Sequence, residues 1–313
     1  MIQYGRVFLA AGILLLSTGI AVDAHDDHPP RKVLDPEAHK PSPLPDRIIL
    51  TWTGDPANSQ AVTWRTDPTI VKGFAEIAEA TDGPEFVKST TRLTAVTESL
   101  ETDLATAHYH TVEFVNLQPA TKYVYRVGDS VNWSEWLQFT TANTTAEPFS
   151  FIYFGDAQNE VKSHWSRVIR EAFKDAPKTR MFLHAGDLIN NANSDAEWGE
   201  WFQAGGWANG MIPSVPIPGN HEYFGGRLLG PVSLSRHWRP QFALPLNGPE
   251  HLQETAYWFD FQGMRLIALN SNVRQEEQSE WLDQVLSTNR QKWNIVSFHH
   301  PIFSAAKNRD NPV

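Results

Sequence analysis

The sequence predicts a two-part fold, an N-terminal all-β sandwich followed by a layered α/β domain. Between Arg47 and Thr141, short runs of β-branched and aromatic residues alternate with turn residues, as they do in β-sandwiches. After Pro148 the pattern changes to strands that alternate with amphipathic helices, which is typical of α/β domains. Four polar blocks follow predicted strands of this second part, where open α/β sheets place their ligand sites.

The N-terminal segment predicts export. We expect residues 1–24 to be a signal peptide, because Arg6 precedes the apolar run Val7–Val22 and the small residue Ala24 follows it. The run is shorter than the ~20 residues of a spanning helix, so we expect no stable membrane insertion after cleavage, although an uncleaved anchor is the alternative. Residues 25–45 have no hydrophobic period, which predicts an extended linker. The expected location is secreted or periplasmic.

Composition limits the partners and the ligands. The 313 residues carry a net charge of −10, which argues against nucleic-acid binding by a diffuse basic surface. This charge does not exclude a phosphate ester, because bound metal ions dominate the field around them. The chain contains no cysteine, so disulfides and thiolate metal sites are excluded. Any metal must therefore bind oxygen and nitrogen ligands.

We expect the sandwich to span residues 46–143. Its predicted strands include Ile48–Trp52, Ala61–Arg65, Tyr109–Phe114 and Tyr123–Val127. The run from Leu117 to Tyr123 resembles the corner of fibronectin type III domains, in which a tyrosine hydroxyl bonds to nearby backbone. Trp52, the following Thr-Gly-Asp and Trp64 together resemble the N-terminal domain of purple acid phosphatases.

We expect the α/β domain to occupy residues 148–313. Its predicted strands are Phe149–Phe154, Arg180–Ala185, Ile212–Ile217, Ala256–Phe261, Met264–Leu269 and Trp293–Phe298. Its predicted helices are Val161–Ala176, Ser194–Phe202 and Gln278–Leu286. Ser194 with Glu197 three residues later fits a helix N-cap, and the prolines of Ile212–Ile217 suit an edge strand. The Gln-Gly pair after Phe261 predicts a hairpin.

The four polar blocks supply donors of the kind that bind two metal ions. Asp156 and Asp187 each follow a glycine at the end of a predicted strand, Asn220 follows Gly219, and His299 follows the last strand. Carboxylate and amide oxygens with imidazole suit Mn, Fe, Zn or Mg more than soft metals. One such block is a common turn, but four of them at strand ends indicate a metal site. Two adjacent metals can clamp the attacking and leaving oxygens of a phosphoryl transfer.

The order and spacing of these blocks resemble the metallophosphoesterases, and the preceding domain indicates their purple acid phosphatase-like branch. The resemblance implies two divalent or trivalent metal ions, which would be Fe, Zn or Mn. It implies that Asp156 binds one metal, that Asp187 bridges both, and that Asn220 and His299 bind the second.

The same resemblance implies a reaction. His221 would lie beside the leaving group as the catalytic proton donor or transition-state stabiliser, and Glu222 would orient it. The nucleophile would be a metal-bound hydroxide, since cations lower the pKa of coordinated water. The expected reaction is hydrolysis of a small phosphate monoester.

Two positions depart from the family pattern. Purple enzymes carry a tyrosine three residues after the bridging aspartate, and Asn190 stands there in this sequence. The wider superfamily has a histidine two residues after the first aspartate, and here that residue is Gln158. Both amides can donate an oxygen to a metal, and of the two we expect Asn190 to be a ligand, although amides are weaker donors than phenolate or imidazole. Without the phenolate we expect a colourless protein.

A third departure concerns the end of the domain. The family closes its site with a Gly-His-x-His block, and none follows His300, so we expect a C-terminally incomplete domain with weakened metal retention. His300 and Arg309 are the candidate substrate-binding residues. Further candidate substrate contacts lie in the loop after the Asn-His-Glu block, although a solvated loop is the interpretation that we favour there; they are Arg227, Arg236, His237 and Arg239.

Two other functions fit the same sequence. A phosphodiesterase or nucleotidase would use the same metals, because loops and not the metal ligands build the leaving-group pocket. A non-catalytic binding protein, in which the sandwich recognises a surface or polymer, would explain the missing block but not the retained ligands.

Overall fold

The computed structural model describes residues 33–225 and 232–303. The chain divides into a short unit, Met1–Leu34, and a large unit, Asp35–Val313, which contains every element described below. The predicted signal peptide lies outside the described residues. The described part of the predicted linker is not wholly extended, because it contains the short helix α1 (Asp35–Ala38) and the buried side chain of His39. Within the described ranges, no helix is both long and apolar enough to cross a membrane.

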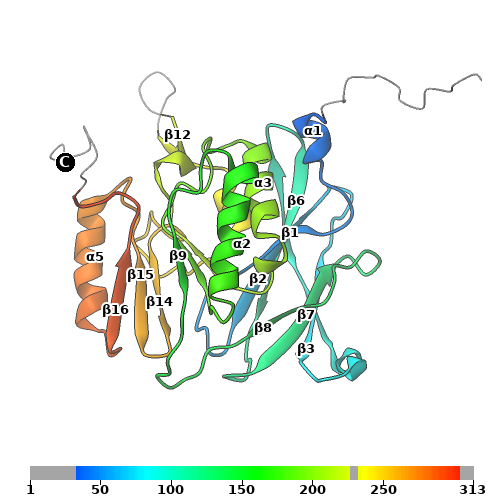
Figure 1. Ribbon diagram of the computed structural model, residues 1–313, viewed down its shortest axis with the longest axis horizontal. Helices are drawn as coiled ribbons and strands as arrows, with labels where there is room; N and C mark the ends of the chain where they lie inside the picture. Colours follow the sequence, from blue (N-terminus) through cyan, green and yellow to red (C-terminus); the bar gives the residue numbers. More distant parts are fainter. Residues whose placement is uncertain (1–32, 226–231, 304–313) are drawn as a thin grey trace, which may run out of the picture. The chain divides into compact units, whose positions relative to one another are not determined.

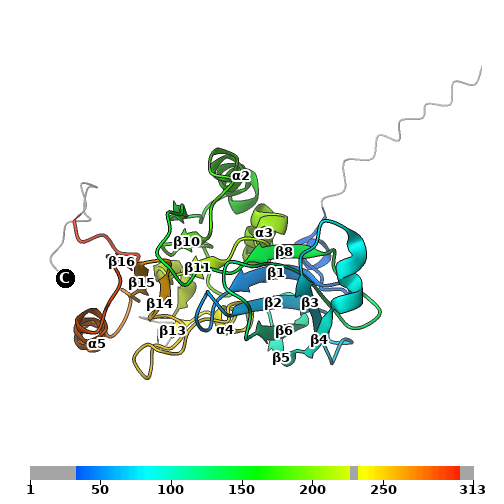
Figure 2. The ribbon, with the colours of Figure 1, turned by 90° about the horizontal axis from the view of Figure 1, so that it is seen from below.

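Two four-stranded antiparallel sheets form the predicted sandwich (Figures 1 and 2). The first contains, in spatial order, β1 (Asp46–Thr51), β2 (Gln60–Thr66), β6 (Thr106–Phe114) and β5 (Val96–Glu101). The second contains β4 (Thr91–Thr94), β3 (Phe74–Glu79), β7 (Lys122–Gly128) and β8 (Leu137–Thr140). A short 3₁₀ helix, η1 (Pro84–Ser89), links β3 to β4.

Aromatic side chains fill the space between these two sheets. Trp64, Phe114 and Tyr125 are almost completely buried there, because inward and outward side chains alternate along each strand. The predicted tyrosine corner is present, since the hydroxyl of Tyr123 accepts a hydrogen bond from the backbone N–H of Gln118 at 2.8 Å.

The α/β part contains two three-stranded sheets (Figures 1 and 2). The first is parallel, with β10 (Phe182–His184) between β11 (Ser214–Pro216) and β9 (Ile152–Phe154). In the second, β15 (Met264–Ala268) pairs antiparallel with β14 (Tyr257–Phe261) and parallel with β16 (Trp293–Ser297). The predicted hairpin and the edge position of the proline-containing strand are both confirmed.

Helices and short turns connect these strands. They are the π-helical turn η2 (Val161–Trp165), α2 (Ser166–Asp175), α3 (Asp195–Gly205), η3 (Gly206–Ala208), η4 (Asn220–Glu222), α4 (Trp238–Gln241) and α5 (Gln275–Ser287). A two-stranded ribbon, β12 (Tyr223–Phe224) with β13 (Ser233–Leu234), completes the fold. The predicted N-cap of α3 is confirmed, because the Ser194 hydroxyl accepts the N–H of Glu197.

The strands β9 and β10 are shorter than their apolar runs. Phe149 and Phe151 precede β9 and pack, partly buried, against the main core. This run still bonds to the segment before β10, because the carbonyl oxygen of Ser150 accepts the backbone N–H of Arg180 at 2.8 Å. The helix predicted to start at Val161 begins instead with η2, after Asn159 and Glu160 have taken φ of 66° and 55°. Single π-helical turns are common beside functional sites, and this one follows the first polar block directly.

Candidate metal centre

The four polar blocks meet at the carboxyl ends of strands. Asp156 follows β9 and Asp187 follows β10, and both adopt the left-handed backbone region, with φ of 46° and 54°. Non-glycine residues in that region cost of order 1 kcal/mol and cluster at functional sites. Asn220 follows β11, and His299 follows β16 of the other sheet. The two sheets thus contribute side chains to one place.

Two glycines make this convergence possible. A Cβ on Gly186, which has a φ of +92°, would lie 2.6 Å from the backbone nitrogen of Gly219 and 2.8 Å from Nδ1 of His299. A Cβ on Gly219 would lie 2.2 Å from Oδ1 of Asp187. A side chain at Gly186 would therefore push the second, third and fourth blocks apart, and a side chain at Gly219 would push the second and third apart.

Ligand atoms of three residues form the core of the site. One carboxylate oxygen each from Asp156 and Asp187 and one ring nitrogen of His299 all lie within 4.8 Å of one another. Nε2 of His299 is 3.2 Å from Oδ2 of Asp187 and 3.2 Å from Oδ1 of Asn220. Two donors of one ion at ~2.1 Å lie at most ~4.2 Å apart, so only a small contraction is needed to bind a cation.

The orientation of His299 fits metal binding. Its Nδ1 lies 2.9 Å from the carbonyl oxygen of Ala185, which can only accept, so Nδ1 carries the proton and donates. The lone pair of Nε2 then faces the oxygens of Asp187 and Asn220, an arrangement that a cation or a proton must neutralise. Burial disfavours charge on His299, but the carboxylate of Asp187 raises its pKa. Burial likewise opposes ionisation of Asp187, while His299 and the N–H of His221 lower its pKa. The residues present fit a metal ion.

Comparison with known proteins agrees with this geometry. Residues 149–312 match the family model of the calcineurin-like phosphoesterases. The chain belongs to the calcineurin-like phosphoesterase family. Residues 45–141 also match the model of the purple acid phosphatase N-terminal domain, so the predicted family is confirmed for both parts of the chain.

Solved structures share the fold of this phosphoesterase chain. A purple acid phosphatase from yellow lupin seeds (Lupinus luteus) superposes with a TM-score of 0.64 at 18% identity, over 81% of this chain and 50% of that one. PhoD superposes with a TM-score of 0.58 at 16% identity, over 82% of this chain and 62% of that one. The fold class predicted from the sequence is therefore confirmed.

A curated relative shares part of the sequence. A probable cyclic nucleotide phosphodiesterase from Moraxella catarrhalis is 28% identical over 131 residues, which cover 39% of this chain and 44% of that protein. The phosphoesterase chain thus spans about half the length of the relatives it matches.

Gln158 lies against the aspartate predicted to bridge the metals. Its Nε2 donates to Oδ2 of Asp187 at 3.0 Å, and its backbone N–H donates to the carbonyl of the same residue. Its Oε1 is buried without a hydrogen-bond partner among the described residues. A buried carbonyl oxygen normally has a partner, and an oxygen of this kind can coordinate a cation.

His221 is held by a residue other than the one expected. Its Nδ1 donates to the carbonyl oxygen of Asn190 at 2.6 Å, and its Nε2 lies 4.0 Å from Oδ2 of Asp187. The expectation that Glu222 orients the imidazole is wrong, because its carboxylate accepts the backbone N–H groups of Gly219, Asp187 and Leu188 instead. Burial raises the pKa of Glu222 to about 7, and these N–H donors act in the opposite direction. Glu222 therefore joins the second and third blocks through their main chains.

The remaining predicted site residues lie at different distances from the centre. Asn190 is exposed and contributes its main chain to the hydrogen bond with His221. His300 is exposed, its ring centroid lies 5.0 Å from that of His299, and its Nδ1 lies 2.8 Å from the hydroxyl of Ser271. Arg309 lies outside the described residues.

Three of the four loop residues named as candidate substrate contacts lie in the described part of the chain, and each contacts other protein groups. His237 is completely buried, with Nε2 3.3 Å from Oδ1 of Asp195, so its prediction as a substrate contact is wrong. Arg236 donates from its backbone to Asn193 and from its side chain to a sandwich carbonyl. Arg239 lies 3.4 Å from the carboxylate of Glu254. Arg227 lies outside the described residues.

Sequence reasoning missed one residue beside the site. Glu197 was predicted only as part of the cap of α3, yet its carboxylate accepts the backbone N–H groups of Asn190 and Asn191 at 2.7 and 2.8 Å. The capping pattern signalled the helix start, but it held no information about which loop the carboxylate would bind.

Proposed function

We propose that this chain is a metal-dependent phosphoesterase that hydrolyses phosphate monoesters. The observation that carries the proposal is the convergence of Asp156, Asp187 and His299, with Asn220 beside them, at the carboxyl ends of strands from two sheets. Family membership supports the same reaction class. The mixed carboxylate, amide and imidazole donors suit hard or borderline divalent ions.

Two metal ions are proposed, with ligands assigned along the chain. Asp156 would hold the first ion, Asp187 would bridge, and Asn220 with His299 would hold the second, while Asn190 and Gln158 are proposed amide donors. When bound, the ions supply positive charge that makes water a better nucleophile and neutralises phosphate oxygens. The chain's own contribution is to fix the donors, because Gly186 and Gly219 bring the blocks together.

His221 is proposed as the catalytic acid. Because Nδ1 donates to the Asn190 carbonyl, Nε2 is the ring atom that gains or gives a proton on the side of Asp187. A protonated Nε2 can donate to the oxygen of a leaving group, which lowers the barrier to its departure. His300, next to His299, and Arg309 are proposed to contact phosphate oxygens.

A phosphodiester substrate is the second candidate. The curated relative from Moraxella catarrhalis is named as a probable cyclic nucleotide phosphodiesterase, and that name supports this second candidate. Rates on p-nitrophenyl phosphate and on bis-(p-nitrophenyl) phosphate separate the two.

The test uses the full chain, stripped of metal and reloaded with Mn²⁺. We expect metal-dependent release of p-nitrophenol from the monoester, which Asp187→Ala abolishes and which Asp283→Ala, an exposed aspartate on α5, leaves intact. Calorimetric Mn²⁺ titration of the same proteins reports binding separately from turnover. If Asp187→Ala hydrolyses the ester as fast as the parent protein, the proposed mechanism is wrong.

Location and domain limits complete the proposal. We propose that residues 1–24 direct export to the periplasm or the exterior, that the sandwich spans residues 46–143, and that the phosphoesterase domain starts at residue 148. The N-terminal sequence of protein recovered from the periplasm or medium should begin after Ala24. Protein that keeps Met1 and stays with the membrane would contradict export by cleavage.

A further inference from the structure

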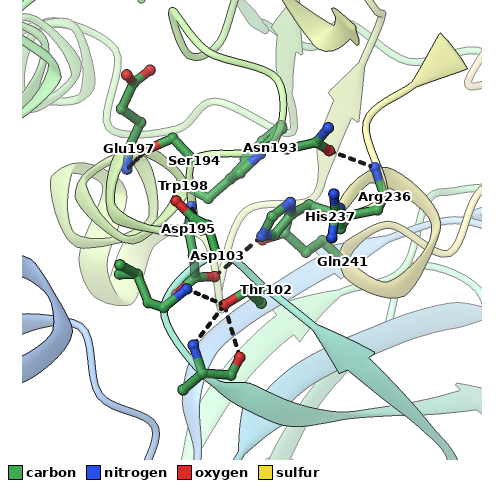
Figure 3. Close-up of polar contacts among 12 residues, drawn as sticks. Thr102, Asp103, Asn193, Ser194, Asp195, Glu197, Trp198, Arg236, His237 and Gln241 are labelled. Carbon is green, nitrogen blue, oxygen red and sulfur yellow. Dashed lines mark hydrogen bonds and ion pairs between the residues drawn. The ribbon is translucent and has the colours of Figure 1, made fainter.

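The sandwich reaches the start of helix α3 through one of its loops. The loop between β5 and β6 carries Asp103, whose Oδ1 accepts the backbone N–H of Asp195 at 2.8 Å. Thr102 shapes this loop, because its hydroxyl accepts two N–H groups of the turn. Asp195 is the first residue of α3, where N–H groups have no partner within the helix. Asp103 therefore caps a helix of the phosphoesterase domain from the sandwich (Figure 3).

Two buried arginines of the sandwich form ion pairs with Asp195 at the same end of this helix. Arg47 on β1 donates to both carboxylate oxygens of Asp195, at 2.7 and 2.9 Å, and Arg65 on β2 donates to Oδ2 at 3.2 Å. The side chains of both arginines and of Asp195 are at most 3% exposed. Removing one member of a buried ionic group of this kind leaves an uncompensated charge, so the contact resists displacement.

From this helix end, hydrogen bonds continue to the proposed metal centre. Glu197, in the first turn of α3, accepts the backbone N–H groups of Asn190 and Asn191. The carbonyl of Asn190 in turn accepts Nδ1–H of His221 at 2.6 Å. Three links therefore connect the sandwich to the imidazole, and each is a hydrogen bond with a charged group or with main chain.

The loop between Asn190 and Asp195 has further fixed points. The indole N–H of Trp198 donates to the carbonyl of Ala192 at 3.0 Å, and Oδ1 of Asn193 accepts the backbone N–H of Arg236 at 3.0 Å. Figure 3 shows Asn193, Arg236 and the ring of His237 gathered at this end of α3. The segment that holds His221 is thus fixed along its length, which limits how far the Asn190 carbonyl can move.

We propose that the sandwich is a positioning part of the active site, in which Asp103 and Glu197 are positioning residues that fix the tautomer of His221. The inference rests on the proposed role of His221 as the acid. With Nδ1–H committed to the Asn190 carbonyl, Nε2 is the nitrogen that faces Asp187. If α3 shifts, this hydrogen bond loosens and the neutral imidazole becomes free to carry its proton on Nε2, which is the commoner form in water.

The test pairs each disruptive variant with a conservative one. Asp103→Ala removes the acceptor for the Asp195 N–H, whereas Asp103→Asn keeps an oxygen there. Glu197→Ala releases Asn190 and Asn191, whereas Glu197→Gln keeps one acceptor oxygen for them. Asp129→Ala is the matched control, because this aspartate likewise accepts backbone N–H groups from a sandwich turn, the one between β7 and β8, which lies outside the proposed chain of contacts.

The readout is the pair of ring ¹⁵N chemical shifts of His221, measured on metal-free protein at one pH near 8.5. The two nitrogens of an imidazole differ in ¹⁵N shift according to which one carries the proton, so the shifts report the tautomer and do not require hydrolysis. We expect the Nδ1–H tautomer in the parent and in Asp129→Ala. Glu197→Ala and Asp103→Ala should show a mixture of the Nδ1–H and Nε2–H tautomers, and Glu197→Gln and Asp103→Asn should return to the Nδ1–H form. Unchanged shifts in Glu197→Ala overturn the link to His221, and unchanged shifts in Asp103→Ala overturn the positioning role of Asp103.

Kinetics supply a second readout. For p-nitrophenyl phosphate we expect Asp103→Ala and Glu197→Ala to lower kcat by about 10-fold with little change in KM, because they act on His221 through the Asn190 carbonyl and not on substrate. A rise in KM at constant kcat contradicts positioning of the acid. If the parent protein hydrolyses neither ester, the proposed function fails, and the ¹⁵N comparison still decides whether the sandwich positions His221.

Discussion

Replacing Gly219 by alanine separates assembly of the metal centre from stability of the fold. The backbone there is ordinary, with φ of −91° and ψ of −171°, so alanine adds no conformational strain of its own. The added Cβ would lie 2.2 Å from Oδ1 of Asp187 and 2.4 Å from its backbone nitrogen. Ordinary contact begins at 3.4 Å, so the second and third blocks must separate by about 1.2 Å, the difference between 3.4 and 2.2 Å.

A displacement of this size should weaken metal binding strongly but lower the stability of the fold only moderately. Metal–ligand distances tolerate ~0.2 Å, so a shift of this size removes at least one donor and we expect Mn²⁺ affinity to fall ~100-fold or more. Overpacking of this kind costs ~1–3 kcal/mol of folding free energy. Calorimetric Mn²⁺ titration measures the first quantity, and urea unfolding followed by tryptophan fluorescence measures the second.

Gly83→Ala is the matched control. Gly83 also has extended backbone, with φ of −120° and ψ of 179°, and a Cβ there meets no described atom within 4 Å. We expect its stability to stay within ~1 kcal/mol of the parent and its Mn²⁺ affinity to be unchanged. Parent-like Mn²⁺ affinity in Gly219→Ala would refute the argument that close approach of these two blocks builds the site.

Three further predictions test the rest of the structure. Burial acts to raise the pKa of Asp195, but His237 and two arginines hold this pKa well below 3.8. The ionised carboxylate therefore stabilises the fold above about pH 4, and this contribution is lost as the pH falls. Asp195→Asn should therefore cost ~3 kcal/mol at pH 7, and urea unfolding at a series of pH values should show the difference from the parent shrinking below pH 4. Tyr123→Phe should lower the free energy of unfolding by ~1–2 kcal/mol, because the Gln118 N–H loses its acceptor. The control Tyr153→Phe, at a side chain that is 58% exposed, should change it by less than ~0.5 kcal/mol. Because Asn190 replaces the phenolate, Fe³⁺-loaded protein should lack an intense visible band, and an absorption spectrum with such a band would contradict that expectation.

Local patterns were sufficient to predict the elements that carry the site. Strand runs, the serine cap of α3 and the hairpin after Phe261 depend on neighbours within a few residues, and the structure has all of them. The position of Asp187 after a buried strand was predictable for the same reason, since the carboxyl ends of parallel strands share one edge of a sheet. The boundaries were less predictable, because the apolar run before β9 is partly buried and bonds to Arg180 through the Ser150 carbonyl without being part of the strand.

Partners across long separations in sequence were not predictable in this way. Glu222 is charged and follows His221 directly, which favoured a role beside the imidazole, yet it is buried under three main-chain N–H groups. His237 lies in a loop rich in arginine, which suggested either a solvated loop or a substrate contact, yet it is buried against Trp198 and Asp195. Sequence period shows which face of an element is apolar, but it does not show which other element covers that face.

The sequence by itself determined a sandwich followed by an α/β domain, and it placed carboxylate, amide and imidazole donors at strand ends. These features follow from side-chain periodicity and turn chemistry, which act over a few residues. Only the tertiary structure decided that His299 meets Asp187 across two sheets and that sandwich residues grip the helix beside the site. Such contacts join residues separated by about a hundred positions, and they exist because the packed cores of both parts bring their loops to one place.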